Sequence, residues 1–226
     1  MELTYREAEH NSTANLTRVV GSSMLQKLKL LFAGRATPHA EALYRATVAK
    51  ARDAAFYETL GAADTVEGRY DLLTLHVHML LTRLRGEGAL AEALSQDIFD
   101  VMMKDMDASL REIGVGDLIV GKRMQQLAAA FYGRGERYKT AFEALEADTP
   151  DLQPLQDAVK NNILPDAPDD ASVEAAAAYV ARQLAALRAQ PAARLMNGVV
   201  RFDEPVLEQA TDAEAEGAGE ETADDG

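Results

Sequence analysis

Residues 69–85 have the sequence RYDLLTLHVHMLLTRLR. At 100° per residue its polar side chains fall on one narrow stripe of a helix, formed by Asp71, Thr74, His78, Thr82 and Arg85. The remaining circumference is almost entirely apolar. A helix of this kind is covered by neighbours on several sides. The segment therefore predicts a central helix near 67–85 in an all-α protein.

Helical patterns continue on both sides of this segment, and no Pro occurs from His39 to Thr149. Thr37 and Pro38 are typical of an N-cap and a first helical position, so a helix is predicted from there towards Gly61. Further helices are predicted over residues 89–113, 117–145, 155–163 and 171–189. The glycines at 133 and 135 leave open whether 117–145 is one kinked helix or two. No alternating pattern is long enough for a sheet, and residues 199–202 are expected to form only a short extended end. The prediction is a single bundle of about six helices.

The net charge of −14 is concentrated at the C-terminus of the 226-residue chain. Residues 203–226 contain ten Asp or Glu and no Lys or Arg, so we expect a disordered acidic tail. Residues 1–23 lack an apolar run of signal-peptide length and are interpreted as a loose extension, which leaves 24–202 as the folded domain. The chain has no Cys, which excludes disulfides and thiolate metal sites. No nucleic-acid partner is expected.

One segment imitates a phosphate-binding loop, because Gly116 is followed by Gly121 and Lys122 at the spacing of that motif. A real loop of this type follows a strand and has Ser or Thr after the Lys, whereas Arg123 stands there. We interpret the segment instead as a joint between two helices. In this interpretation Gly114 ends the first helix in a left-handed conformation and Asp117 caps the second.

Several short motifs of this region resemble the ubiquinol–cytochrome c chaperone family. They are YDLL at 70–73, LHV at 75–77, RLR at 83–85, DMD at 105–107, LREIGVGDL at 110–118 and FYGR at 131–134. The chain is similar to a bacterial member of that family from near Thr37 to Phe142. The resemblance implies an all-α assembly factor for the ubiquinol–cytochrome c reductase that holds newly made cytochrome b. It implies neither catalysis nor a cofactor, and it leaves the oligomeric state open.

A chaperone of this kind needs an apolar surface for its client. Methionines are concentrated in three of the predicted helices, and flexible Met side chains suit varied apolar partners, although ordinary core packing is the alternative. The predicted client-binding residues are Leu72, Leu75, His76, Met79, Met103, Met106, Phe131 and Tyr132.

Membrane contact is a further expectation. The segment Met24–Phe32 places Leu and Phe near one side of a helix with Lys27 and Lys29 beside them. It could lie on an anionic membrane surface, or pack on the bundle as a first helix. No segment is long enough to span a bilayer. We therefore expect a cytoplasmic protein with peripheral contact at the inner face of the cytoplasmic membrane.

Three polar residues interrupt apolar helix faces: His76, Arg83 and Asp105. A buried charge is costly unless it is paired, so Asp105 is predicted to lie within salt-bridge distance of Arg83 or His76. His76 is predicted to be an interior histidine and His78 an exposed one. Two histidines two residues apart on a helix point in different directions, so no metal site is expected.

Clustered aspartates leave a second class of function open, that of a helical prenyl-lipid carrier or isoprenoid-type enzyme. Asp97, Asp100, Asp105 and Asp107 could face a cavity, but they alternate with Lys104 and Arg111 at helical spacing, which favours a solvated face. A deep cavity lined by Asp residues would support the lipid enzyme. An open apolar surface would support the chaperone.

Overall fold

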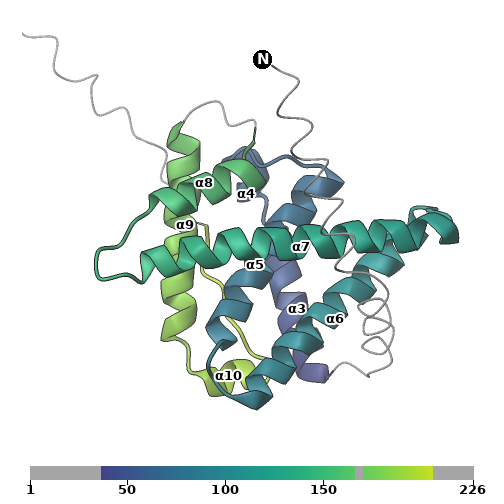
Figure 1. Cartoon of the computed structure of the whole chain (residues 1–226), viewed down its shortest axis with the longest axis horizontal. Coiled ribbons are helices and arrows are strands. Elements are labelled where there is room, and N and C mark those ends of the chain that lie inside the picture. The colour runs from purple at the N-terminus through teal and green to yellow at the C-terminus, as the bar shows by residue number, and fades with distance from the viewer. Residues whose placement is uncertain (1–36, 166–169, 206–226) are drawn as a thin grey trace, which may run out of the picture.

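A computed structural model describes residues 37–165 and 170–205. Six helices of at least ten residues occupy this part of the chain, with two short ones between and after them (Figure 1). The helices are α3 (Pro38–Ala51), α4 (Ala55–Glu58), α5 (Val66–Leu84), α6 (Ala89–Glu112), α7 (Asp117–Leu145), α8 (Gln153–Asn162), α9 (Asp170–Ala189) and α10 (Ala192–Met196). The described residues contain no strand. The all-α prediction is confirmed.

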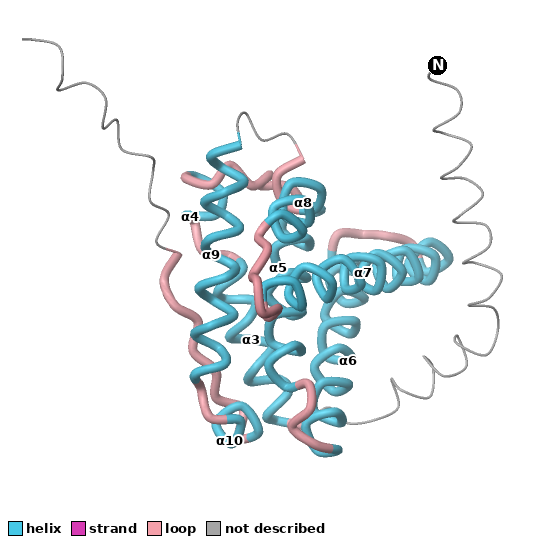
Figure 2. Tube along the Cα trace, turned by 60° about the vertical axis from the view of Figure 1, so that its left-hand side comes forward, coloured by secondary structure: helices cyan, strands magenta, loops and turns pink. Residues whose placement is uncertain are grey.

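The centre of the bundle is α5, as the 69–85 pattern predicts. Thr65 caps its first turn by accepting a hydrogen bond from the backbone N–H of Gly68, 3.1 Å away. The helix contacts α3, α6, α7 and α9, and Figure 2 shows it enclosed by these neighbours. Because it is covered on so many sides, most of its apolar positions belong to the core, including Val77, Met79 and Leu80 with no exposed surface.

Before α5, the structure has two helices, α3 and α4, where the sequence pattern predicts one helix towards Gly61. Thr37 does cap α3, and Pro38 occupies its first turn. The helix ends at Ala51, because the Asp53 carboxylate accepts a hydrogen bond from the N–H of Ala55 and starts the short α4. At the other end of the chain, α10 is a turn of helix that the sequence patterns did not predict. Residues 199–202 are irregular.

The long helix α7 is a single element, so the two-helix alternative is wrong. It crosses α5 and α6 (Figure 1). Gly135 is required by this crossing, since a Cβ there would lie 2.6 Å from Cε1 of His78 on α5. Gly133 faces open space. Of the two glycines, only Gly135 lies close to the neighbouring helix α5.

Three expectations fall wholly or mostly outside the described residues. These are the loose extension at 1–23, the amphipathic segment Met24–Phe32 and the acidic tail beyond residue 205. The first tail residues are described and do contact the bundle. The backbone N–H of Asp203 donates to Oε1 of Gln183 at 3.0 Å, and Glu204 lies 3.4 Å from Nζ of Lys50.

Candidate functional site

The joint between α6 and α7 is built around Gly114, which has φ = +85°. The N–H of Val115 donates to the carbonyl of Leu110 at 3.0 Å, and that of Gly114 to Arg111 at 3.0 Å. These bonds satisfy the last carbonyls of α6. The predicted left-handed residue is confirmed. The cap of α7 is Gly116, which has no side chain, so the prediction that Asp117 is the cap is wrong.

Asp117 has a different role in the joint. Its carboxylate pairs with Arg111, which also pairs with Asp107 at 2.7 Å one turn earlier on α6. One guanidinium therefore links both helices of the joint. This arrangement joins the start of α7 to the end of α6 through exposed side chains.

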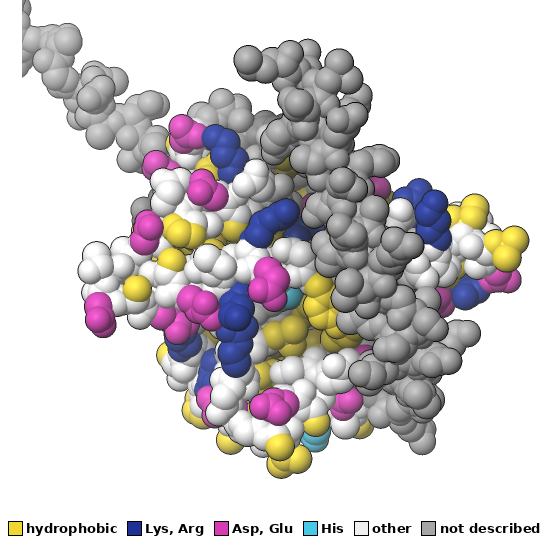
Figure 3. Space-filling view, viewed as in Figure 1, with side chains coloured by type: hydrophobic (Ala, Val, Ile, Leu, Met, Phe, Trp, Pro, Cys, Tyr) yellow, Lys and Arg dark blue, Asp and Glu magenta, His cyan; other side chains and the backbone are white. Residues whose placement is uncertain are grey.

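Apolar side chains stand out at this joint. Ile113, Leu118 and Ile119 are 69%, 98% and 55% exposed. We call residues 113–123 the tip. Figure 1 shows that α7 begins beyond the rest of the bundle, and Figure 3 shows hydrophobic side chains at its outermost end. The tip therefore presents aliphatic surface that no described part of the chain covers.

A second exposed apolar surface lies in the angle between α6 and α7. Tyr132 is 48% exposed, and its ring centroid lies 5.5 Å from that of Phe99 on α6 and 5.7 Å from that of Phe131. Partial burial raises the pKa of Tyr132, and the nearby Asp100 carboxylate raises it further. We call this place the Tyr132 surface: the half-exposed ring of Tyr132, with the buried ring of Phe99 and the Asp100 carboxylate next to it. Hydrophobic side chains gather in this angle in Figure 3.

Most of the predicted client-binding residues are not on any surface. Six of the eight belong to the core, namely Leu72, Leu75, His76, Met79, Met103 and Phe131. Met106 is partly buried, and Tyr132 alone of the eight is exposed. The expectation that Met79 or Met103 is accessible is therefore wrong. The periodicity of α5 could not reveal this, because a helix that is apolar nearly all round shows no preferred solvent side.

His76 is a satisfied interior histidine, as predicted. Its Nδ1 lies 2.7 Å from the carbonyl of Leu72, and its Nε2 lies 2.8 Å from the hydroxyl of Tyr179 on α9. Because a carbonyl only accepts, Nδ1 carries the proton and Nε2 accepts from Tyr179. Complete burial lowers the pKa of His76 to about 4. The ring is therefore neutral and joins α5 to α9.

The predicted pairing of Asp105 is wrong. Asp105 is exposed and accepts a hydrogen bond from the Tyr44 hydroxyl at 2.8 Å. Arg83 donates to the carbonyls of Leu187 and Gln190 at the end of α9, at 3.0 and 2.8 Å, and pairs with Glu87. His76 and Arg83 thus bond to different parts of α9 and Asp105 bonds to α3, so these three residues form no cluster.

The expectation that His78 is exposed is also wrong. Its ring stacks on Phe131 with centroids 4.2 Å apart, and Nε2 lies 3.1 Å from the Phe131 carbonyl. Burial lowers the pKa of His78 to about 4. The polar stripe of α5 is therefore its contact with α7, where a neutral imidazole packs against an aromatic ring and the backbone of Gly135.

A partly buried ion pair that the sequence patterns did not predict lies at the same contact. Asp71 on α5 and Arg134 on α7 approach to 2.6 Å. Burial raises the pKa of Asp71 to about 6, and Arg134 opposes that rise. Arg134 also lies 5.7 Å from the ring centroid of Tyr70. The FYGR string at 131–134 contains this arginine, but nothing in the spacing identified Asp71 as its partner.

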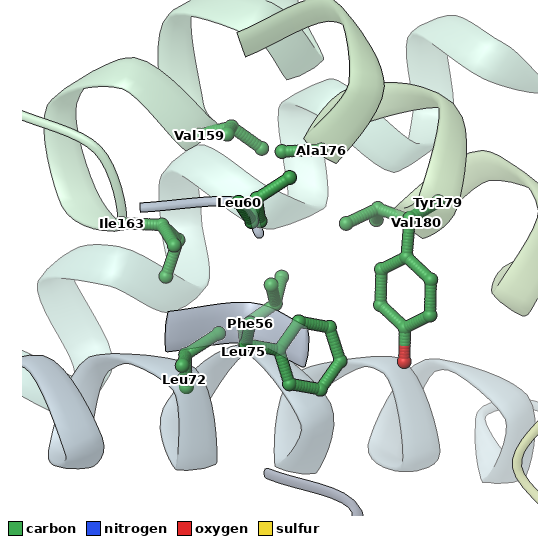
Figure 4. A pocket seen from close by; sticks show the side chains of 9 residues that line it. All are labelled: Phe56, Leu60, Leu72, Leu75, Val159, Ile163, Ala176, Tyr179 and Val180. Carbon is green, nitrogen blue, oxygen red and sulfur yellow. The ribbon is translucent and has the colours of Figure 1, made fainter. Parts of the chain in front are cut away.

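The cavities give no support to a lipid enzyme. One apolar space of about 10 Å³ lies between α4, α5, α8 and α9, lined by side chains such as Phe56, Leu75 and Tyr179 (Figure 4). No carboxylate lines it. A more open cleft of about 500 Å³ lies at the C-terminal ends of α5, α7 and α9. Its three arginines, Arg83, Arg85 and Arg188, are each paired with a glutamate.

The described ranges also contain no group of three or more His, Asp or Glu side chains placed to hold a metal ion. Asp97, Asp100 and Asp107 lie on α6 without facing either cavity. Within 37–165 and 170–205, no helix combines the length and apolar character that crossing a bilayer requires.

A family model described as ubiquinol-cytochrome C chaperone matches residues 58–202, well over half of the chain. Among solved structures, the chain is similar to the crystal structure of the Cbp3 homolog from Brucella abortus, with 34% sequence identity and a TM-score of 0.66. That similarity covers 81% of this chain and 96% of the other. No curated protein matches the chain. The resemblance noted in the sequence is confirmed, and the chain belongs to the ubiquinol–cytochrome c chaperone family.

Proposed function

We propose that this protein is an assembly factor for the ubiquinol–cytochrome c reductase that holds newly made cytochrome b until it is incorporated. The observation that carries the proposal is the family match over residues 58–202, which includes all of α5, α6 and α7. The described residues also offer what a chaperone needs, namely apolar side chains exposed on a stable helical frame. The two histidines inside the bundle, His76 and His78, have structural hydrogen-bond partners, and we propose no catalytic activity.

The Tyr132 surface is the part of the bundle that we propose contacts the client. An apolar membrane helix that has not yet inserted must be shielded from water. The Tyr132 ring provides a large apolar area at low entropic cost, since its neighbours Phe99 and Phe131 already restrict it. Asp100 and Asp97 lie on the adjoining face of α6. These carboxylates suit the Lys and Arg residues that flank membrane helices on the cytoplasmic side.

This client surface is narrower than the sequence predicted, because six of the eight predicted residues lie in the core. The part of α5 that supports the surface is His78. His78 stacks on Phe131, and Phe131 contacts both Phe99 and Tyr132. A change in the α5–α7 contact would therefore alter the exposed rings. We propose that α5 positions the aromatic rings, and that the client contacts side chains of α6 and α7.

A deletion strain tests the proposal. We expect the assembled reductase and cytochrome b to be depleted, and wild-type protein to restore both. A Tyr132→Asp variant should fold and accumulate normally but fail to restore the reductase, because a charge on the contact surface repels an apolar client. The matched control is Leu90→Asp, since Leu90 is 78% exposed at the start of α6. Normal reductase levels in the deletion strain would contradict the proposal.

We also propose that the protein works at the inner face of the cytoplasmic membrane, where cytochrome b is inserted. The supporting argument is the nature of the client, which leaves the ribosome as an apolar chain close to the bilayer. Fractionation of host cells tests this location. Recovery of the protein entirely in the membrane-free fraction, even while cytochrome b is being made, would contradict it.

A further inference from the structure

We infer that the tip is a membrane-docking element whose aliphatic side chains enter the surface of an anionic bilayer. The proposed insertion involves Ile113, Leu118 and Ile119, with Lys122 and Arg123 at the lipid headgroups. This inference goes beyond the proposed function, because holding a client requires no lipid contact. It also assigns membrane contact to a described part of the fold, separate from the segment Met24–Phe32.

Exposure is the first observation. Leu118 is 98% exposed, and Ile113 and Ile119 are both more than half exposed. Other strongly exposed aliphatic side chains, such as Leu90 and Val66, are isolated at helix starts. The tip brings three together within seven residues on either side of one turn. A group of aliphatic side chains exposed in this way indicates an interaction site more strongly than single ones do.

The second observation is that the tip is held in a defined shape. Gly114 ends α6 in a left-handed conformation, and the guanidinium of Arg111 joins Asp107 on α6 to Asp117 on α7. Both views of the chain show the first turns of α7 projecting beyond its neighbours (Figures 1 and 2). The aliphatic side chains therefore lie at a projecting helix end. This end is already ordered in the folded protein, so membrane binding does not have to order it.

The third observation is where the positive charges lie. Lys122 follows Leu118 by four residues, and Arg123 follows Ile119 by four. Each cation therefore lies on the same helix face as one aliphatic side chain, about 6 Å further along the axis. Interfacial apolar side chains enter a bilayer by about 5–10 Å. With α7 directed end-on at the membrane, the two cations would reach the headgroups as the aliphatic side chains enter the acyl region.

These cations have no ion-pair partner among the described residues. Arg123 lies 3.5 Å from Oε1 of Gln126, and Lys122 has no carboxylate within 4 Å in the described ranges. The acids of residues 107–123 (Asp107, Glu112 and Asp117) are matched in number by the cations Arg111, Lys122 and Arg123, so this end is neutral on a chain of net charge −14. An acidic protein can thus approach an anionic surface by this end with little local repulsion.

The shape and composition favour a bilayer over a protein partner. Anchors at protein interfaces are enriched in Trp, Tyr and Arg and occupy fitted pockets, whereas the exposed tip side chains are aliphatic and sit on a convex end. A fluid lipid surface accepts a convex apolar end without a matching pocket. Three side chains give weak, reversible attachment, which suits a chaperone that must release its client.

Vesicle flotation with the full chain tests the inference. The vesicles are phosphatidylcholine alone, or phosphatidylcholine with about one third phosphatidylglycerol. We expect binding to the anionic vesicles, a loss of at least tenfold for Leu118→Asp, and wild-type binding for the matched control Leu90→Asp. Replacing both Lys122 and Arg123 by Ala should weaken binding to anionic vesicles by roughly tenfold or more, since each cation near such a surface contributes about fivefold.

The outcomes distinguish lipid contact at the tip from lipid contact at another segment and from a protein interface. Absence of wild-type binding, or unchanged binding of Leu118→Asp, would overturn the inference. Loss of binding in a full-length Leu28→Asp, Leu31→Asp variant with the tip intact would assign membrane contact to Met24–Phe32 instead. If vesicle binding is absent and Leu118→Asp releases a co-purifying protein, the tip is a protein interface. Client cross-linking at Tyr132 in detergent solution tests the proposed function separately, because no vesicle is present there.

Discussion

The middle of α5 and the tip at the start of α7 are both rich in apolar residues, yet their surroundings are opposite. Met79 on α5 has no exposed surface, whereas Leu118 on α7 is 98% exposed. α5 is contacted by α3, α6, α7 and α9, while the first turn of α7 extends past its neighbours. This difference shows that apolar composition alone does not tell which residues form the core and which form exposed surfaces for partners.

The same substitution should therefore have opposite consequences in the two regions. The largest effect is expected for Met79→Asp, which would place an unpaired carboxylate in the centre of the bundle. We expect it to destabilise the fold by more than about 4 kcal/mol, which is a large part of the stability of an ordinary protein. Circular dichroism of the purified variant checks this. A cooperative melt near the wild-type temperature would mean that α5 is not the central helix.

The second-largest effect is expected from lowering the pH, which should destabilise the fold through the buried histidines of α5. An unfolded histidine takes up a proton near pH 6.5, whereas burial lowers the pKa values of His76 and His78 to about 4. The unfolded chain therefore binds more protons between these pH values, and stability falls as the pH is lowered from 6.5 to 4. A pKa shift of this size lowers the free energy of unfolding by about 3 kcal/mol for each histidine once the pH has fallen to about 4.

Asp71 should offset part of this loss. Its pKa is raised from 3.8 to about 6, so the folded state binds a proton first and gains stability between pH 6 and 3.8. Its partial exposure makes this gain smaller than the losses from the histidines. Urea unfolding at several pH values checks the balance. A free energy of unfolding that stays flat from pH 7 to about pH 4.5 would contradict the buried neutral histidines, and His78→Gln should flatten the wild-type slope.

The contact between α5 and α7 allows a sharper comparison of two glycines. A side chain at 135 would collide with His78, whereas a side chain at 133 meets nothing within 4 Å. We expect Gly135→Leu to cost about 3 kcal/mol through overpacking. Gly133→Leu should be neutral or slightly stabilising, because Leu favours a helix more than Gly does. Equal melting temperatures for the two variants would contradict the close helix crossing.

A smaller effect is expected at the base of the tip. Gly114 has φ = +85°, so Gly114→Val should destabilise the fold by roughly 1–2 kcal/mol through backbone strain. Gly116 has φ = −64° and open space around it, so Gly116→Ala is the control and should change little. Thermal melts of both variants check this, and an unchanged melt of Gly114→Val would contradict the left-handed residue at this position.

The smallest effect on stability is expected at the tip itself. Leu118→Asp should change the free energy of unfolding by less than about 0.5 kcal/mol, because the side chain contacts almost nothing. A loss comparable to that of Met79→Asp would show that the tip is covered in the full chain. This pair of Asp variants is the most direct test of the contrast between the two regions.

Much of the fold could be predicted, because short sequence patterns determine where most of the helices begin and end. The one-sided polar stripe identified α5, the Gly–Val–Gly–Asp run identified the joint, and Thr37 with Pro38 identified the start of α3. The break at Asp53 was missed because it depends on one side-chain hydrogen bond to Ala55. Such a bond competes with the helix only weakly and leaves no periodic signal.

The site was less predictable because its partners are distant in sequence. Asp105 finds Tyr44, which is 61 residues away, and Arg83 finds carbonyls more than 100 residues away. Helical periodicity shows that a residue breaks an apolar face, but it does not reveal which helix covers that face. For the same reason periodicity does not separate the core residues of α5 from a client surface, and it gives no sign that Leu118 is exposed.

The central claim is that cytochrome b contacts the Tyr132 surface. A photoreactive amino acid placed at position 132 in the full chain, in cells making cytochrome b, tests it directly. The account predicts a cross-link to newly made cytochrome b from position 132, and none from the more exposed control position 90 on α6. No cross-link from 132, or equal cross-links from 132 and 90, would contradict it.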